Sequence, residues 1–222
     1  HKRAYEGDIG PNTGGMGCYS DTNHSLPFLK ENEILGARNI NERVSRALFD
    51  YTGEQYKGIL YGGFMATASG VKLIEYNARF GDPEAINLLT LLDSDLASIC
   101  SSIGEGTLES INFRNEASVC KYIVPKGYGS NPSMDTNLVV DESYKNYSNL
   151  YYAAVNQDSS GRITTTSSRA AAIVSTGSSI QEAEEKSESG LAHISGKNLF
   201  IRHDIGKSDL IKRRIDHMES IR

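Results

Sequence analysis

The spacing of apolar residues predicts helices and strands in alternation along the chain. Residues 31–51 repeat apolar positions at helical intervals, which predicts one amphipathic helix. The stretch GILYGGFMATASGVKLIEYNARF predicts two strands, at 58–67 and 71–77, joined by a Ser-Gly turn. The apolar stripe of the helix consists of Ile34, Leu35, Val44, Ala47 and Leu48.

A second helix is predicted from residue 84 to residue 103, where AINLLTLLDSDLASIC is rich in apolar residues. Asp82 and Pro83 are expected to act as its N-cap and its first helical residue. Residues 1–23, with PNTGGMG at their centre, are expected to be loop-like. Later strands are predicted at 118–124, 150–155 and 170–175, and later helices at 181–193 and 208–218.

The character of the sequence changes after Gly104, and this change predicts two domains. The 222 residues suffice for one large domain or two small ones. Hydrophobic residues make up 38% and charged residues 23%, a balance that permits a folded core. We expect residues 1–112 to form one domain and residues 113–222 to form a small β-rich domain with flanking helices. The expected fold class is α+β.

Composition also argues against several function classes. No apolar run approaches the ~20 residues that span a bilayer, and HKRAYEGDIGPN does not resemble a signal peptide, so a cytoplasmic protein without a membrane partner is expected. The net charge of −5 argues against a nucleic-acid partner, and the basic run 212–214 is expected to be a solvated helix face. Cys18, Cys100 and Cys120 lack metal-ligand spacing and are expected to be reduced, mostly buried thiols.

The strand that ends in IEYNARF carries polar residues at every second position. Alternate side chains of a strand share a face, so Glu75, Asn77 and Arg79 are expected to project together. A carboxylate and an amide oxygen suit Mg²⁺ that also binds substrate phosphates, and an arginine beside them can hold phosphate oxygens in a fork. A strand with one solvated face would show the same alternation, so spacing alone leaves both interpretations open.

Two neighbouring features favour the phosphate interpretation. The strand runs into FGDPE, where a helix start would offer free N–H groups to an anion. Upstream, Gly14, Gly15 and Gly17 permit close approach of backbone N–H groups to a ligand, with Asp8 and Asn12 beside them. A glycine-rich surface turn is the alternative, because neither the dinucleotide fingerprint nor the P-loop motif is present. No activated nucleophile is visible, so the predicted chemistry is metal-assisted phosphoryl transfer.

Four segments together resemble the glycinamide ribonucleotide synthetases, which are phosphoribosylamine–glycine ligases of the ATP-grasp superfamily. Looser similarity continues through VPKGYG, RAAAIVSTG and RHDIG, so the resemblance covers essentially the whole chain. The segments that carry it most specifically are HKR, GDIGPNTGGMGCYS, YKGILYGGFM and KLIEYNARFGDPE.

The resemblance implies an ATP-dependent ligase of purine biosynthesis that joins glycine to 5-phosphoribosylamine through a glycyl phosphate. ATP would be the co-substrate and Mg²⁺ or Mn²⁺ the metal, held by Glu75 and Asn77. Arg79 would contact phosphate or the glycyl phosphate, and Asp82 would orient substrate or cap the helix. The same resemblance places Asp8, Asn12, Gly14 and Gly15 at the border of the substrate cleft.

The chain also departs from the family pattern. No Rossmann-like domain or adenine-holding strands precede His1, so the chain resembles only the C-terminal portion and is expected to be inactive without the N-terminal portion. Gly63 stands where some members have a glutamine ligand, which would leave one metal shell incomplete. Ser167 and Ser168 replace paired glycines before Arg169, and His203 replaces a lysine. Another ATP-grasp carboxylate–amine ligase, or a non-catalytic phosphate-binding or assembly module, remains the alternative.

Overall fold

The computed structural model describes all residues from 1 to 222, and the chain folds into two compact units. Helices and strands occur in both units, which confirms the expected α+β class. Each unit is assembled from separated segments of the chain. Unit 1 comprises residues 1–26, 82–91 and 115–211, and unit 2 comprises residues 27–81, 92–114 and 212–222.

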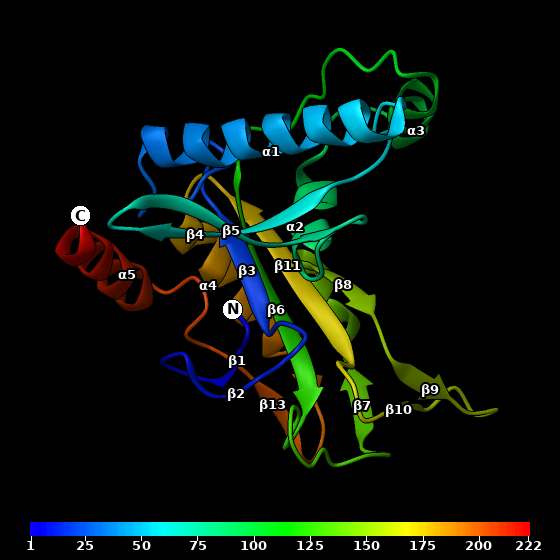
Figure 1. The fold of residues 1–222 in the computed structure, drawn as a ribbon. Coiled ribbons are helices and arrows are strands. Elements are labelled where there is room, and N and C mark those ends of the chain that lie inside the picture. The colour runs from blue at the N-terminus through cyan, green and yellow to red at the C-terminus, as the bar shows by residue number, and fades with distance from the viewer. The chain divides into compact units, whose positions relative to one another are not determined.

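A five-stranded antiparallel sheet forms the centre of unit 1. Its middle strand is β6 (Ala117–Pro125), whose residues 117–123 pair with the whole of β11 (Ala171–Gly177). On the other side, β6 pairs with β3 (Gly17–Ser20) and with β13 (Leu199–Ile201). The sheet ends at β8 (Asn149–Tyr152), which pairs with β11, and Figure 1 shows β3, β6, β11 and β8 side by side.

Shorter strands and two helices complete unit 1. A four-stranded sheet has the order β12-β7-β10-β9, and β1 pairs with β2 in a separate hairpin. The bounds of these elements are β1 Arg3–Tyr5, β2 Ile9–Asn12, β7 Asn137–Val140, β9 Val155–Gln157, β10 Ile163–Thr165, β12 Ile194–Ser195, α2 Glu84–Leu91, α4 Ile180–Leu191 and the 3₁₀ helix η1 Glu142–Asn146.

The hydrophobic core of unit 1 lies between its sheets and α4. Every residue of β6 is buried, as expected for a central strand that is covered on both faces. The helix α4 begins at the N-cap Ser179, whose hydroxyl accepts a hydrogen bond from the amide of Glu182. One face of α4 is buried at helical spacing: Ile180, Ala183, Glu184, Ser187, Gly190 and Leu191.

A buried lysine on β6 is neutralised by acids from α4. The ammonium of Lys121 is fully buried and donates to Glu184 at 2.7 Å and to Glu188 at 2.5 Å. The ring Nδ1 of His203 lies 2.8 Å from the same Glu188 carboxylate. Although burial alone would raise it, the hydrogen bonds from His203 and Lys121 lower the pKa of Glu188 to about 2. The pairing keeps each buried charge compensated.

Unit 2 contains one long helix, a two-stranded hairpin and two further helical segments. α1 (Glu31–Thr52) lies against the hairpin of β4 (Tyr61–Thr67) and β5 (Gly70–Asn77). α3 (Leu96–Glu105) follows, and α5 (Ser208–Ile221) contributes its residues from 212 onward.

Capping explains the bounds of α1. The carboxylate of Glu33 accepts from the amide of Lys30 at 2.8 Å, which satisfies a free donor at the helix start. Gly53 ends the helix at φ 76°, in the left-handed region. The C-terminal end of the chain packs nearby, because Arg222 donates to Glu33 at 2.7 Å.

Burial in unit 2 is much sparser than in unit 1. No residue of α1 is buried, and Ile99 and Met218 are the buried hydrophobic residues of the whole unit. The predicted stripe therefore lies on a helix, as expected, but none of its residues is buried. None of the helices combines the length and the apolar character that a membrane span needs.

Three expectations from the sequence are wrong. The predicted helix at 84–103 is broken after Leu91, because the carboxylate of Asp95 caps a new helix by accepting from the amide of Ser98. The loop expected over 1–23 contains β1, β2 and β3, since β3 gains its hydrogen bonds from β6, far away in sequence. Cys100 is exposed, whereas Cys120 is buried.

The ion pair with Glu188 makes the stability of unit 1 depend on pH. The hydrogen bond to Glu188 raises the pKa of His203 above its ordinary value of 6.5. The protonated ring therefore contributes stability that is fully present below about pH 6.5 and is lost as pH rises through the folded-state pKa. His203→Gln should lower the free energy of unfolding at about pH 6 and change it little at about pH 9. Urea unfolding at both pH values measures the difference.

His217→Gln is the matched control for that experiment, because His217 lies on α5 outside the network. Equal effects of His203→Gln at both pH values would contradict a charged His203–Glu188 pair.

Candidate functional site

The predicted metal strand is β5, and its alternation is kept in the part that carries the two predicted oxygen ligands, Glu75 and Asn77. Tyr61 pairs with Asn77 and Gly63 pairs with Glu75 across the hairpin. The register then shifts, so that Phe64 opposes Leu73 and one residue, Ile74, is left over as a bulge. Because the bulge precedes both ligand candidates, Glu75 and Asn77 are two residues apart on regular strand and share a face.

The opposite face of β5 anchors the hairpin to α1. The hydroxyl of Tyr76 donates to Asn41 at 2.7 Å, and its ring meets Phe64 edge-on with centroids 6.3 Å apart. Burial raises the pKa of Tyr76, so its hydroxyl remains a donor. Since neighbouring side chains alternate, Glu75 and Asn77 point away from α1.

Arg79 meets Asn77, although it lies beyond the strand. β5 ends at Asn77, and Arg79 sits in the bend that follows. Its Nη2 donates to Asn77 Oδ1 at 3.3 Å, and its Nη1 donates to the carbonyl of Phe80 at 2.7 Å. Glu75 and Asn77 therefore lie on the strand, whereas Arg79 lies in the bend, where a hydrogen bond joins it to Asn77.

The donor set fits a hard cation that completes its shell elsewhere. Glu75 and Asn77 supply two oxygen-bearing side chains on one exposed strand face. No cluster of three histidine, cysteine or acidic residues capable of holding a metal exists in the chain. A cation here would need water or phosphate oxygens as further ligands, and it would compete with Arg79 for the oxygen of Asn77.

Gly63, which lies opposite Glu75, contributes no side chain to the predicted metal site. A Cβ added at Gly63 would lie 3.5 Å from Cγ of Glu75, which is ordinary van der Waals contact. A longer side chain at this position would stand beside the carboxylate. Glycine therefore removes a possible neighbouring ligand without being required by the backbone.

In unit 1, the glycine-rich loop joins β2 to β3 and packs tightly against the sheet. Gly17 has φ 153°, and a Cβ there would lie 2.3 Å from the carbonyl oxygen of Cys120. Gly15 has φ 119°, and a Cβ there would lie 2.8 Å from Cδ of Pro83. The glycines are needed because the loop passes so close to β6 and to the start of α2.

The amides of this loop are already hydrogen-bonded within the protein. Thr13 N donates to the carbonyl of Lys2 at 2.7 Å, and Met16 N donates to the carbonyl of His1 at 2.8 Å. Gly15 N donates to the hydroxyl of Thr13 at 3.1 Å, and Gly14 N donates at 3.3 Å to the hydroxyl of Tyr128. In this conformation the loop does not hold out free N–H groups, contrary to the expectation from its composition.

Arg169 connects the loop to Asp82. Its guanidinium donates to both carboxylate oxygens of Asp82, at 2.6 and 3.1 Å, in a bidentate pair. The same guanidinium donates to the carbonyl of Gly14 at 3.1 Å and lies 3.4 Å from that of Gly15. Its side chain is only 15% exposed, so solvent screens this pair less than a surface pair.

Tyr122 on β6 contacts both members of the Asp82–Arg169 pair. Its hydroxyl donates to Asp82 at 2.7 Å, and its ring lies 4.4 Å from the guanidinium carbon of Arg169. Burial and the hydrogen bond to Asp82 raise the pKa of Tyr122 well above its ordinary value, so the phenol stays protonated. Asp82 lies two residues before α2 and pairs with Arg169, so it is not the predicted N-cap.

Asp8 belongs to a different cluster. It adopts φ 60°, and its Oδ1 accepts from the fully buried Arg202 at 2.8 Å and lies 3.1 Å from His1 Nδ1. Arg202 also binds Asp204 through two hydrogen bonds, of 2.9 and 2.7 Å. Although burial alone would raise it, the hydrogen bond from Arg202 lowers the pKa of Asp204. Asp8 thus holds the turn between β1 and β2 in place.

The structure brings together only some of the predicted residues. In unit 1, Gly14, Gly15 and Asp82 meet around Arg169, while Asn12 is exposed at the end of β2. In unit 2, Asn77 and Arg79 meet. Sequence reasoning did not assign a role to Arg169, Tyr122 or Arg202. The only signal was that Arg169 begins the segment RAAAIVSTG and Arg202 begins the segment RHDIG, both of which resemble the family.

Two domain families match the chain one after the other. The phosphoribosylglycinamide synthetase ATP-grasp (A) domain family matches residues 1–85, and the phosphoribosylglycinamide synthetase C domain family matches residues 118–208. The expected domain boundary between residues 112 and 113 falls between these two matches. It also lies close to residue 115, where the chain passes from unit 2 into unit 1. The boundary stays a prediction.

Curated relatives carry the name phosphoribosylamine–glycine ligase. The protein from Methanosarcina acetivorans is 47% identical over all of this chain and 50% of its own length. The protein from Methanocella arvoryzae is 49% identical over all of this chain and 51% of its own length. The chain therefore spans about half the length of the curated relatives it matches.

Solved structures agree in fold. Phosphoribosylamine–glycine ligase from Thermotoga maritima superposes with a TM-score of 0.78 at 26% identity, over 92% of this chain and 49% of that one. The biotin carboxylase subunit of pyruvate carboxylase superposes with a TM-score of 0.55 at 16% identity, over 90% of this chain and 44% of that one, a likeness of fold alone. With both domain families matched in order and relatives near half identity along its full length, the chain belongs to the phosphoribosylglycinamide synthetase family.

Proposed function

We propose that the chain supplies the metal- and phosphate-binding half of an ATP-dependent ligase that joins glycine to 5-phosphoribosylamine. The observation that carries the proposal is the shared face of Glu75 and Asn77, with the Arg79 guanidinium hydrogen-bonded to Asn77. Family membership and the name of the relatives support the choice of ligase. The other half of the enzyme would supply the rest of the ATP site.

The reaction needs charge neutralisation more than an activated side chain. The carboxylate of glycine attacks the γ-phosphorus of ATP, ADP leaves, and glycyl phosphate forms. The amine of 5-phosphoribosylamine then attacks the acyl carbon, phosphate leaves, and the amide nitrogen loses a proton. Bound Mg²⁺ or Mn²⁺, held by Glu75 and Asn77, would neutralise phosphate charge in the first step.

Arg79 would bind phosphate oxygens once it releases Asn77. Its present partners are an amide oxygen and a backbone carbonyl, neither of which carries a full charge. A phosphate group offers the guanidinium a stronger, charge-assisted and bidentate partner. Arg79 is therefore the residue we assign to the transferred phosphoryl group.

Asp82 and Arg169 would position the glycine-rich loop that borders the substrate cleft. Arg169 uses its remaining donor capacity on the carbonyls of Gly14 and Gly15, so the Asp82–Arg169 pair sets the position of the loop. We assign Asp82, Gly14 and Gly15 to positioning, with the exposed Asn12 as the loop residue available to a ligand. Asp8 has a supporting role through Arg202.

A chimera tests the ligase function directly. The half of the Methanosarcina acetivorans relative that this chain does not match is joined to this chain, and ADP formation is measured. Sustained ADP formation should require both glycine and 5-phosphoribosylamine, because the glycyl phosphate formed from glycine in the first step must be consumed by the amine in the second before the site can turn over again. Equal turnover with another amino acid in place of glycine would assign the chain to a different carboxylate–amine ligase. A folded chimera that never releases ADP would reject the proposal.

Metal binding can be measured on the chain itself. Glu75→Gln should weaken Mn²⁺ binding by about tenfold or more, since it removes the one charged ligand of the set. Gly63→Gln should strengthen Mn²⁺ binding, because it adds an amide oxygen beside Glu75. Electron paramagnetic resonance of free Mn²⁺ reports both changes. Glu54→Gln, an exposed acid outside the hairpin, is the control, and equal effects of Glu54→Gln and Glu75→Gln would remove the metal from this strand.

A double-mutant cycle tests the Asp82–Arg169 pair. Arg169→Gln and Asp82→Asn should show a coupling free energy of about 1 to 2 kcal/mol, above that of an exposed pair. Hydrogen exchange at Gly14 and Gly15 should accelerate in either variant, and Arg169→Lys should restore part of the protection. The exposed pair Arg38–Glu42 on α1 is the matched control, with an expected coupling of about 0.5 kcal/mol or less. No coupling, with unchanged exchange, would show that the loop is held by other contacts.

A further inference from the structure

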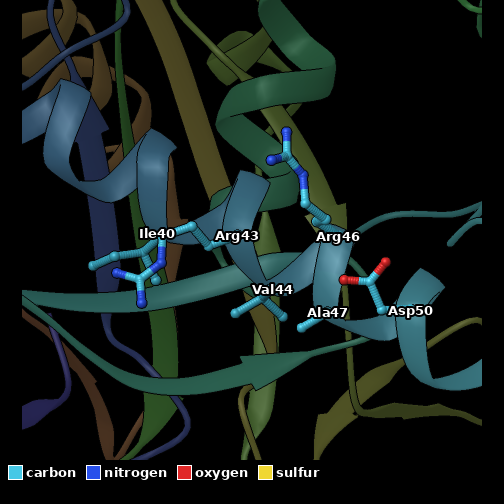
Figure 2. A pocket seen from close by; sticks show the side chains of 6 residues that line it. All are labelled: Ile40, Arg43, Val44, Arg46, Ala47 and Asp50. Atoms are coloured by element: carbon cyan, nitrogen blue, oxygen red, sulfur yellow. The ribbon is translucent and has the colours of Figure 1, made fainter.

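The parts of the chain outside the proposed site differ in the chemistry that they offer. A hollow of about 490 Å³ lies along α1, and Figure 2 shows Val44 and Ala47 projecting from the same side of that helix. No nucleophilic or redox-active side chain lines it: its residues are Ile40, Arg43, Val44, Arg46, Ala47 and Asp50. In unit 1, by contrast, β3 and β6 bring two thiols together.

Cys18 of β3 and Cys120 of β6 lie directly opposite each other. Their Cα atoms are partners in the antiparallel register, and the amide of Tyr122 donates to the carbonyl of Met16 two residues further along. Because hydrogen-bonded pairs alternate along such a ladder, Cys18 and Cys120 form the next hydrogen-bonded pair. The Cα atoms of such a pair are about 5.5 Å apart, which is within the range that a disulfide requires.

Both cysteine side chains lie on the face of the sheet that α2 covers. The Cys18 thiol donates to Oδ1 of Asn87 on α2, and Nδ2 of Asn87 donates to the hydroxyl of Ser118 at 2.8 Å. Cys120 is fully buried, whereas Cys18 keeps partial exposure. Cys18 is therefore the member of the pair that a small oxidant can reach, and Cys120 can react only through Cys18.

The next pair on the same face shows that hydroxyls can serve the fold equally well here. Ser20 and Ser118 lie opposite each other two residues along, and their hydroxyl oxygens are 3.0 Å apart in a hydrogen bond. A serine offers the same kinds of donor and acceptor as a cysteine and is of similar size. What the two cysteines add to this face is the capacity to form a covalent bond.

We propose that Cys18 and Cys120 are a thiol–disulfide site, in which a small peroxide is the oxidant and the disulfide joins β3 to β6. The thiolate of Cys18 attacks one oxygen of hydrogen peroxide, hydroxide leaves, and a sulfenic acid forms on Cys18. The sulfur of Cys120 then attacks the sulfur of Cys18, gives up its proton, and water leaves as the S–S bond forms. Two thiols and one hydrogen peroxide thus give one disulfide and two water molecules.

The environment of Cys18 makes this reaction slow without a supplied oxidant. Burial raises the pKa of the Cys18 thiol well above its ordinary value, and a hydrogen bond with Cys120 acts in the same direction. The thiolate is the reactive species, so little of it is present near neutral pH. The pair therefore stays reduced until a peroxide is supplied, and bulky oxidants are excluded by the packing of α2.

The disulfide acts on the glycine-rich loop, because β3 follows that loop directly. Gly14 lies four positions before Cys18. In the reduced chain, hydrogen bonds and packing alone hold β3 on β6. A covalent bond between strands about a hundred residues apart in sequence restricts every state in which β3 has left the sheet, and such states become rarer. Oxidation therefore fixes the loop in the conformation that it has here.

Peptide mapping on the chain tests the site. The Cys100→Ser background removes the exposed third thiol. After millimolar hydrogen peroxide, a tryptic digest made without reductant should contain one new species that joins residues 4–30, which carry Cys18, to residues 115–121, which carry Cys120. Dithiothreitol should separate the two peptides again. Cys120→Ser in the same background is the matched control, because it keeps every methionine that peroxide also oxidises.

Hydrogen exchange on the same samples tests the effect on the loop. In the oxidised chain, the amides of residues 14–20 should exchange more slowly by about tenfold or more, whereas the peroxide-treated Cys120→Ser variant should show no slowing. Two free thiols after treatment, or a sulfinic acid on Cys18 without the cross-link, would overturn the site. A cross-link that forms only in urea would do the same. A native cross-link with unchanged exchange would overturn the action on the loop. None of these readouts depends on ligase activity.

Discussion

The pairing of β3 with β6 is the constraint on which the rest of unit 1 depends. It places four residues at the beginning of the chain beside a strand about a hundred residues later. Gly17 permits the contact, because a side chain there would collide with the carbonyl of Cys120. Once β3 is docked, the glycine loop is carried to Arg169 and to the start of α2. The loop, the ion pair and the supporting tyrosine are consequences of one backbone pairing.

Buried charge in unit 1 is compensated within the unit, and this separates structural from functional polar groups. Arg202 and Lys121 are fully buried, and each is bound by two carboxylates. Arg169 differs, because its partner Asp82 remains 48% exposed. A buried, saturated pair fixes geometry, whereas a half-exposed pair beside a glycine loop can respond to a ligand. The distinction favours a structural role for Asp8 and keeps Asp82 as a candidate site residue.

The parts of the fold predicted from sequence are those with a local cause. α1, β5, β6, β11, α4 and α5 follow from periodicity and capping within each segment. The short strands β1, β2, β3, β7, β10, β12 and β13 were missed because their hydrogen bonds come from distant partners. The same limit applies to the site. Spacing predicted the shared face of Glu75 and Asn77, but the bulge at Ile74 and the bond between Arg169 and Asp82, 87 positions apart, depend on tertiary contacts.

The contrast in burial between the units links folding to chemistry. Unit 1 has a continuous core, so its loop and ion pairs are held without help. The predicted oxygen ligands of unit 2, Glu75 and Asn77, lie on a hairpin of two strands, beside a helix with no buried residue. Metal affinity depends on how well such ligands are pre-organised, since ordering them on binding costs conformational entropy. Ordering Glu75 and Asn77 would therefore be part of the cost of binding a cation on this hairpin.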